Sequence, residues 1–175
     1  MSILKFLGFE KKNEGRSQGS SDIETLRKIV SELDQLEPER ARYIASFAYL
    51  LSRVAHSDLD ISDEEVSEME RIVRQIGGLP EEQAVIVVQM AKTRETLFGS
   101  TENYLVTREF ERLANREQKL ALIECLFAVS AADDSISTVE DNEIRQIATE
   151  LHLDHEAYIS TKAAFKDHLA VLNKK

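Results

Sequence analysis

The sequence predicts an all-α protein, and three observations lead to this fold class. Glycine and proline are rare, at 6 and 2 of 175 residues, so the turns that connect β-strands are scarce. Apolar residues recur at three- and four-residue spacing along most of the chain, which is typical of amphipathic helices. Hydrophobic residues make up 42% of the chain, enough for a buried core. We expect one compact domain of about eight helices.

The N-terminus differs in composition from the rest of the chain. Residues 1–9 are strongly apolar and are followed by a stretch rich in Lys, Gly and Ser, which is the composition of a flexible linker. We expect a flexible tail over residues 1–21 and a helical domain over residues 22–175. The apolar segment has two interpretations: a disordered tail, or a short anchor on a membrane surface or a partner protein.

The first helices of the domain follow from apolar spacing and from start and stop residues. Apolar stripes run from Ile23 to Leu36 before Pro38, from Ile44 to Val54, and from Val66 to Ile76 before Gly77 and Gly78. Pro80 then opens a fourth helix, because proline is favoured in a first helical turn. The run 85–88 is also compatible with a strand, but the helix start before it favours a helix; a strand there would overturn the fold class.

Later helices are predicted over residues 102–114, 117–132, 138–151 and 155–172. The second and sixth helices are more continuously apolar than their neighbours, as buried helices are. We therefore expect them in the centre of the domain, where they would bury Phe47, Leu51, Leu122, Leu126 and Phe127.

The chain contains an internal repeat at a shift of 75 residues. Each copy has an apolar helix, an acidic turn and a second helix. The shift places Val54, Asp58, Ile61, Ser62, Glu65, Glu68 and Ile72 on Val129, Asp133, Ile136, Ser137, Glu140, Glu143 and Ile147. Helix pairs that cannot bury an apolar face alone usually pack against each other. A pseudo-twofold domain with its two acidic turns in equivalent positions is therefore expected.

The acidic turns are the strongest chemical signal in the sequence. Residues 56–70 hold seven acids and residues 131–144 hold five, and neither stretch contains Lys or Arg. Hard cations such as Ca²⁺ and Mg²⁺ bind several oxygen ligands that converge from one loop. The sequence resembles only the second half of an EF-hand loop, so an ordinary EF-hand is excluded. The candidate ligands of a divalent cation (Ca²⁺, Mg²⁺, Mn²⁺ or Zn²⁺) are Asp58, Asp60, Glu65, Asp133, Asp134 and Glu140.

A purely structural interpretation competes with the cation site. Ser62 and Glu65, like Ser137 and Glu140, have the spacing of a capping box, in which both side chains satisfy free N–H groups. Capping explains neither Asp58 nor Asp133, because both lie at the end of the preceding helix, where the dipole disfavours a carboxylate. A bound cation would offset that cost.

An apolar helix that leads into Asp-x-x-Ile-Ser-x-x-Glu, a pattern present in both copies, resembles the TerB-like tellurite-resistance family, and also the N-terminal region of DjlA-type J-domain proteins. The resemblance covers roughly residues 38–172 and implies an all-helical fold with internal pseudo-symmetry, a proposed metal-binding role for the acidic residues and no established enzyme activity. The residues carried over are Asp58, Glu65, Asp133 and Glu140. Leu59 stands where the family usually has glycine, so the first turn departs from the family pattern and the second fits it better.

Composition excludes several other functions. The net charge of −10 disfavours contact with a phosphate backbone, so no nucleic-acid partner is expected. Cys125 lies in an apolar run, which is typical of a buried, inert thiol. His152 and His155 lack a third ligand, so they are not expected to form a metal site. No nucleophile or phosphate loop accompanies the carboxylates, so we expect no enzyme activity.

No signal sequence or membrane span is apparent, so we expect a cytoplasmic protein. A contact of residues 1–9 with the inner face of the membrane is left open.

Two hypotheses for the function follow. In the first, a TerB-like binding protein holds divalent cations at the acidic turns and serves a stress-response assembly. In the second, the protein is a helical adaptor with an unidentified protein partner, and its acidic turns are only helix caps.

Overall fold

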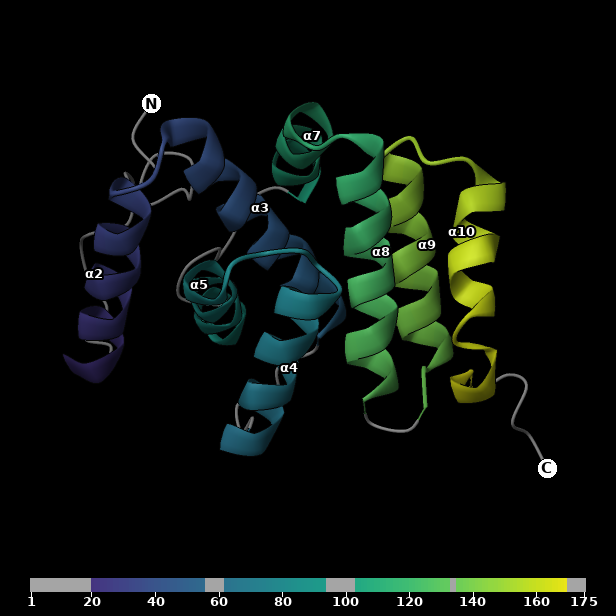
Figure 1. Cartoon of the computed structure of the whole chain (residues 1–175), viewed down its shortest axis with the longest axis horizontal. Helices are drawn as coiled ribbons and strands as arrows, with labels where there is room; N and C mark the ends of the chain where they lie inside the picture. Colours follow the sequence, from purple (N-terminus) through teal and green to yellow (C-terminus); the bar gives the residue numbers. More distant parts are fainter. Residues whose placement is uncertain (1–19, 56–61, 94–102, 133–134, 170–175) are drawn as a thin grey trace.

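The computed structural model describes residues 20–55, 62–93, 103–132 and 135–169 (Figure 1). Within these ranges the chain forms eight α-helices and a short 3₁₀-helix, and no strand, which confirms the all-α fold class. The α-helices are α2 (Ser20–Asp34), α3 (Pro38–Val54), α4 (Asp63–Gln75), α5 (Glu81–Lys92), α7 (Asn103–Leu113), α8 (Arg116–Ala131), α9 (Thr138–Glu150) and α10 (His155–Ala163); the 3₁₀-helix is η2 (Lys166–His168).

The run 85–88 is helical, as its start signal predicted. It lies within α5, which follows Pro80 and buries Ile86, Val87 and Val88 against the core. Val85, the first residue of the run, is 38% exposed. The helix forms because tertiary packing of the other three residues outweighs the β-propensity of valine.

The helix predicted over residues 155–172 is too long. α10 ends at Ala163, and the chain continues through η2 to Leu169. The Ile136 N–H donates to the His168 carbonyl at 2.6 Å, and Leu169 forms an isolated parallel bridge with Ile136. Leu169 is buried, so the chain leaves the helix to place this side chain in the core beside the second acidic turn.

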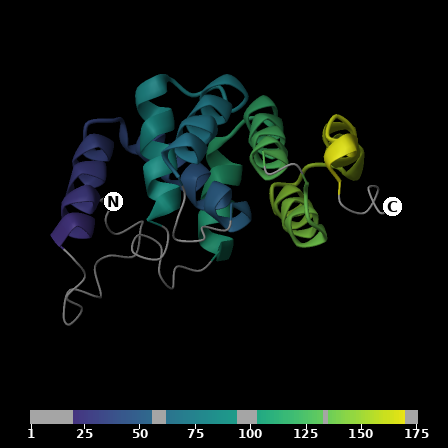
Figure 2. The same ribbon diagram turned by 90° about the horizontal axis from the view of Figure 1, so that it is seen from below.

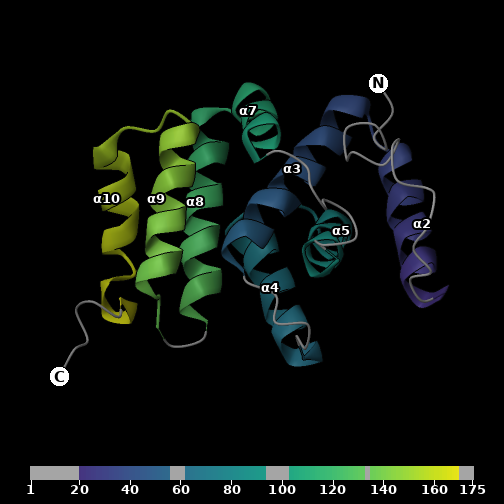
Figure 3. The same cartoon turned by 180° about the vertical axis from the view of Figure 1, so that it is seen from behind.

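The helices form an elongated domain with α2 at one end and α10 at the other (Figures 1 and 2). α3 crosses the middle and packs on α5, α7, α8 and α9. α8, α9 and α10 lie side by side in the C-terminal half (Figure 3). None of the described helices has both the length and the apolar character that a bilayer span requires.

The predicted central residues are all in the core. Phe47 and Leu51 of α3 and Leu122, Leu126 and Phe127 of α8 are fully buried. Aromatic rings extend this core to the neighbouring helices: Phe110 of α7 stacks on Tyr43 with ring centroids 5.3 Å apart. The most apolar helices therefore lie at the centre, as the sequence predicted.

α4 ends at the predicted glycine pair. Gly78 has φ +73°, a left-handed conformation that glycine adopts without strain. A Cβ at Gly77 would lie 2.5 Å from the Val73 carbonyl oxygen and 3.0 Å from Phe47 Cζ. One glycine allows the turn, and the other allows the close approach of this turn to α3.

The two copies of the repeat are the helix pairs α3–α4 and α8–α9, and they pack reciprocally. α3 contacts α9, and α4 contacts α8, so each first helix of a pair packs on the second helix of the other pair. Figure 3 shows α4 and α8 side by side. This reciprocal packing is the pseudo-twofold relation that the repeat predicted, and it brings the ends of the two acidic turns together.

Candidate functional site

Both predicted capping boxes are present. In the first, the Glu65 N–H donates to Ser62 Oγ at 3.2 Å, and the Ser62 N–H donates to Glu65 Oε2 at 2.7 Å. In the second, the corresponding distances between Ser137 and Glu140 are 3.1 and 2.7 Å. These four residues therefore cap the N-termini of α4 and α9, whether or not a ligand also binds to them. Each glutamate uses Oε2 for the cap, and its Oε1 makes no hydrogen bond to the described residues.

Hydrogen bonds also hold two glutamates of α4 in the charged form. The backbone N–H and the side chain of Ser62 keep the pKa of Glu65 below its usual value. The Arg71 guanidinium does the same for the pKa of Glu68, which it contacts at 2.5 Å. The carboxylates of Glu65 and Glu68 are thus ionised at neutral pH.

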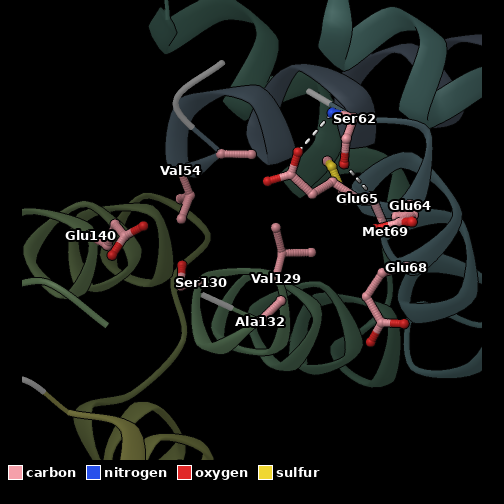
Figure 4. A pocket seen from close by; sticks show the side chains of 11 residues that line it. Val54, Ser62, Glu64, Glu65, Glu68, Met69, Val129, Ser130, Ala132 and Glu140 are labelled. Atoms are coloured by element: carbon pink, nitrogen blue, oxygen red, sulfur yellow. Dashed lines mark hydrogen bonds between the residues drawn. The ribbon is translucent and has the colours of Figure 1, made fainter. Parts of the chain in front are cut away.

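A pocket of about 570 Å³ lies where the two helix pairs meet (Figure 4). Residues from both repeat copies line it, and several are equivalent under the 75-residue shift: Val54 with Val129, Ala55 with Ser130, and Glu65 with Glu140. The complete lining is Val54, Ala55, Ser62, Glu64, Glu65, Glu68, Met69, Val129, Ser130, Ala132 and Glu140. The pocket therefore lies close to the pseudo-twofold axis.

Two of the six predicted cation ligands, Glu65 and Glu140, line this pocket from opposite sides (Figure 4). The other four, Asp58, Asp60, Asp133 and Asp134, lie outside the described residues. The described ends of both turns nevertheless border the pocket: Ala55 and Ser62 flank the first turn, and Ala132 immediately precedes Asp133. Among the described residues, no group of three or more His, Cys, Asp or Glu side chains is arranged to hold a metal ion.

Sequence reasoning missed two features of this pocket. Glu64 and Glu68 add carboxylates from α4, and the helical spacing of Glu64, Glu65 and Glu68 could have indicated this. Ser130 is 3% exposed, and its hydroxyl has no hydrogen-bond partner in the described part of the chain. The sequence could not have indicated this unpaired hydroxyl. A serine within a helix usually donates to the backbone carbonyl one turn earlier, so a serine in the apolar run of α8 is expected to be paired.

The acids of the second copy are partly committed to structural contacts. Glu143, the repeat counterpart of Glu68, accepts a hydrogen bond from Arg53 at 2.7 Å. Asp141 accepts hydrogen bonds from the Tyr158 hydroxyl and, at 2.7 Å, from the Lys162 ammonium. The pocket consequently has three glutamates from α4 and one, Glu140, from α9.

Three further residues that the sequence analysis considered, Cys125, His152 and His155, do not line this pocket. Cys125 is fully buried in α8, and burial raises the pKa of its thiol to about 12. His152 and His155 are separated by the end of α9 and the start of α10, as predicted, and Asp154 caps α10 through the Ala157 N–H at 2.7 Å. Neither histidine belongs to a metal-ligating group among the described residues.

Comparisons with known proteins identify one family. The family model described as Tellurite resistance protein TerB matches residues 43–163. The matched range runs from α3 to the end of α10, and it includes both repeat copies and the whole pocket. No curated protein and no solved structure matches the chain significantly.

Proposed function

Because the chain belongs to the TerB tellurite-resistance family, we propose that it is a non-enzymatic protein that binds divalent cations at its two acidic turns. The observation that carries this proposal is the shared pocket. Glu65 and Glu140 occupy equivalent positions in the two repeat copies and line the same pocket. A cation bound at either turn would therefore lie at the edge of this pocket, beside the interface between the two halves of the domain.

The chemistry of the donors supports this proposal. The proposed ligands are Asp58, Asp60, Glu65, Asp133, Asp134 and Glu140, all of which are carboxylates. Carboxylate oxygens are the preferred ligands of Ca²⁺ and Mg²⁺, whereas Zn²⁺ sites usually include nitrogen or sulfur donors. The capping boxes leave one oxygen each of Glu65 and Glu140 for a cation. Bound cation charge would offset the mutual repulsion of these carboxylates.

Thermal unfolding with and without each ion tests the proposal. A ligand at 100 times its dissociation constant stabilises the folded state by about 2.7 kcal/mol, so Ca²⁺, Mg²⁺, Mn²⁺ or Zn²⁺ should raise the midpoint and EDTA should reverse the shift. Ser137→Ala is the matched control, because it removes one hydrogen bond of the cap and keeps every proposed ligand. We expect this variant to be less stable and to show the same ion-dependent shift. No shift with any of the four ions would contradict the proposal.

The alternative is a helical adaptor without a metal site, and the capping boxes favour it. They give Glu65 and Glu140 a complete structural role without a ligand. An adaptor of this kind would contact a protein partner, and residues 1–9, which lie outside the described residues, would contact the inner face of the membrane. In either form we place the protein in the cytoplasm, and the cation-binding form would serve a stress-response assembly. Co-sedimentation with anionic lipid vesicles, compared between the full chain and a chain lacking residues 1–9, tests the membrane contact.

A further inference from the structure

The pocket between the repeat copies has acidic side chains on two opposite sides and apolar side chains between them. Glu64, Glu65 and Glu68 of α4 lie on one side of it, and Glu140 of α9 lies on the opposite side (Figure 4). Val54 and Val129 lie between these two sides, and Met69 adds a further apolar wall. Carboxylates therefore stand at both ends of an apolar surface. This arrangement follows from the pseudo-twofold axis, which places equivalent glutamates on either side of equivalent valines.

The Ser130 hydroxyl lies in the wall of this pocket, where it could form a hydrogen bond with a polar atom of a ligand. Ser130 is 3% exposed, and its Oγ has no hydrogen-bond partner among the described residues. In Figure 4 its oxygen points from α8 toward the side of the pocket where Val54 and Glu140 lie. An unpaired buried hydroxyl destabilises a folded protein, so its presence beside a pocket indicates that a bound molecule supplies the missing partner.

We propose that this pocket binds a linear aliphatic polyamine. Its terminal ammonium groups would pair with the α4 glutamates at one end and with Glu140 at the other. The methylene chain would cover Val54 and Val129, and an amine N–H would donate to Ser130 Oγ. A volume of about 570 Å³ is in the range of small-molecule pockets. This inference goes beyond the proposed function and does not require that a metal ion binds.

Other ligand classes satisfy fewer of these features. The carboxylates repel an anion, and a neutral apolar molecule would bury charged groups without pairing them. A single metal ion pairs with carboxylates but leaves the valines and Met69 uncovered. A ligand with one ammonium group neutralises only one side of the pocket. A flexible chain with a cationic group at each end meets all of these conditions.

Isothermal titration calorimetry with spermidine tests this proposal. We expect one spermidine per chain, bound at least tenfold more tightly than hexylamine, which carries one ammonium group on a similar apolar chain. Ser130→Ala should weaken spermidine binding about tenfold, because it removes a hydrogen bond to a charged donor. The same variant should unfold at a higher temperature, since it removes a buried hydroxyl that has no partner in the described part of the chain. This opposite effect on stability distinguishes lost binding from lost folding.

Glu140→Gln should weaken spermidine binding as well, whereas Glu117→Gln serves as the charge-matched control. Glu117 is exposed in the first turn of α8, and Ser130 is in the last turn of the same helix. Equal losses in Glu117→Gln and Glu140→Gln would overturn the proposal, because they would show attraction to the acidic surface alone. An unchanged spermidine affinity in Ser130→Ala would also overturn the proposal, as would binding of hexylamine that is as tight as that of spermidine.

The test also separates this site from the proposed metal site. Ser130→Ala keeps every proposed metal ligand, so we expect it to leave the affinity for divalent cations unchanged. Asp133→Ala should weaken cation binding and leave spermidine bound to the glutamates. Weaker spermidine binding in Ser130→Ala, at an unchanged cation affinity, supports the polyamine site. This result supports it even if the wild type binds no divalent cation.

Discussion

Arg53 donates through Nε to the Glu143 carboxylate at 2.7 Å, although Arg53 is only 3% exposed. The same guanidinium contacts Glu150 at 2.8 Å and the Thr107 hydroxyl at 3.2 Å, so one buried cation joins α3 to α7 and α9. Glu143 is the repeat counterpart of Glu68, which lines the pocket. The two repeat copies therefore use the equivalent glutamate differently: one stabilises the interface between the halves, and the other faces the pocket.

Arg53→Met should destabilise the protein by about 2–4 kcal/mol. Breaking a buried ion pair typically costs about 3–5 kcal/mol, and the partial exposure of both glutamates reduces this cost. Urea unfolding measures the change. Arg71→Met is the matched control, because the Arg71–Glu68 pair is exposed and such pairs contribute little. A similar loss of stability in both variants would show that the buried network has no special role.

The same network predicts loss of stability in acid. Burial favours the neutral form of Glu150, but its hydrogen bonds to Arg53 outweigh this effect and hold its pKa below the usual value of 4.5. A lowered pKa in the folded state stabilises the protein above the unfolded pKa, and this contribution is lost as pH falls through the folded pKa. We therefore expect the free energy of unfolding to decrease below about pH 4.5 in the wild type. The decrease should be shallower in Arg53→Met, and equal slopes would contradict this assignment.

His152→Gly should stabilise the protein by about 0.5–1 kcal/mol. His152 has φ 59°, a left-handed conformation at the end of α9 in which a Cβ is unfavourable. Its Nδ1 lies 3.5 Å from Glu111 Oε1, so the substitution also removes one weak contact. His152→Ala separates the two effects, because it keeps the Cβ and loses the imidazole. Thermal unfolding should rank the glycine variant above the wild type and the alanine variant below the glycine variant.

Much of the fold could be predicted from the sequence, because its signals are local. Apolar spacing, Pro38, Pro80 and the Gly77–Gly78 pair set helix boundaries through contacts between near neighbours in the chain. The end of α10 could not be predicted in this way. It depends on the contact of Leu169 with Ile136, which is distant in sequence and leaves no periodic pattern.

The site was predictable only in part, for the same reason. The repeat placed Glu65 and Glu140 in equivalent positions, and the structure brings them to one pocket. The commitment of Glu143 to Arg53 depends on packing between the two halves. The Ser130 hydroxyl, which has no hydrogen-bond partner among the described residues, lines the pocket that this packing forms. Neither has a sequence signal, because the shift that aligns the copies pairs Arg53 with Ala128 and Ser130 with Ala55.

Cys125 should be unreactive in the folded protein. Burial raises the pKa of its thiol to about 12, so almost no thiolate forms at neutral pH, and the side chain is fully buried. We expect a colorimetric disulfide reagent to modify no thiol in the native chain and one thiol in the urea-unfolded chain. Rapid modification of the native protein would show that α8 opens locally or that Cys125 is accessible.

The central claim, that divalent cations bind at the acidic turns, is tested most directly by calorimetric titration of Ca²⁺, Mg²⁺, Mn²⁺ and Zn²⁺ into the wild type and into Asp58→Ala, Asp133→Ala and Glu140→Gln. Glutamine can still accept the Ser137 N–H in the capping box, so Glu140→Gln removes ligand charge and keeps the helix start. We predict that Asp133→Ala weakens binding more than Asp58→Ala, and that Glu140→Gln weakens it at unchanged helicity. Unchanged cation affinity in Asp133→Ala and Glu140→Gln would contradict the claim and leave the turns as helix caps.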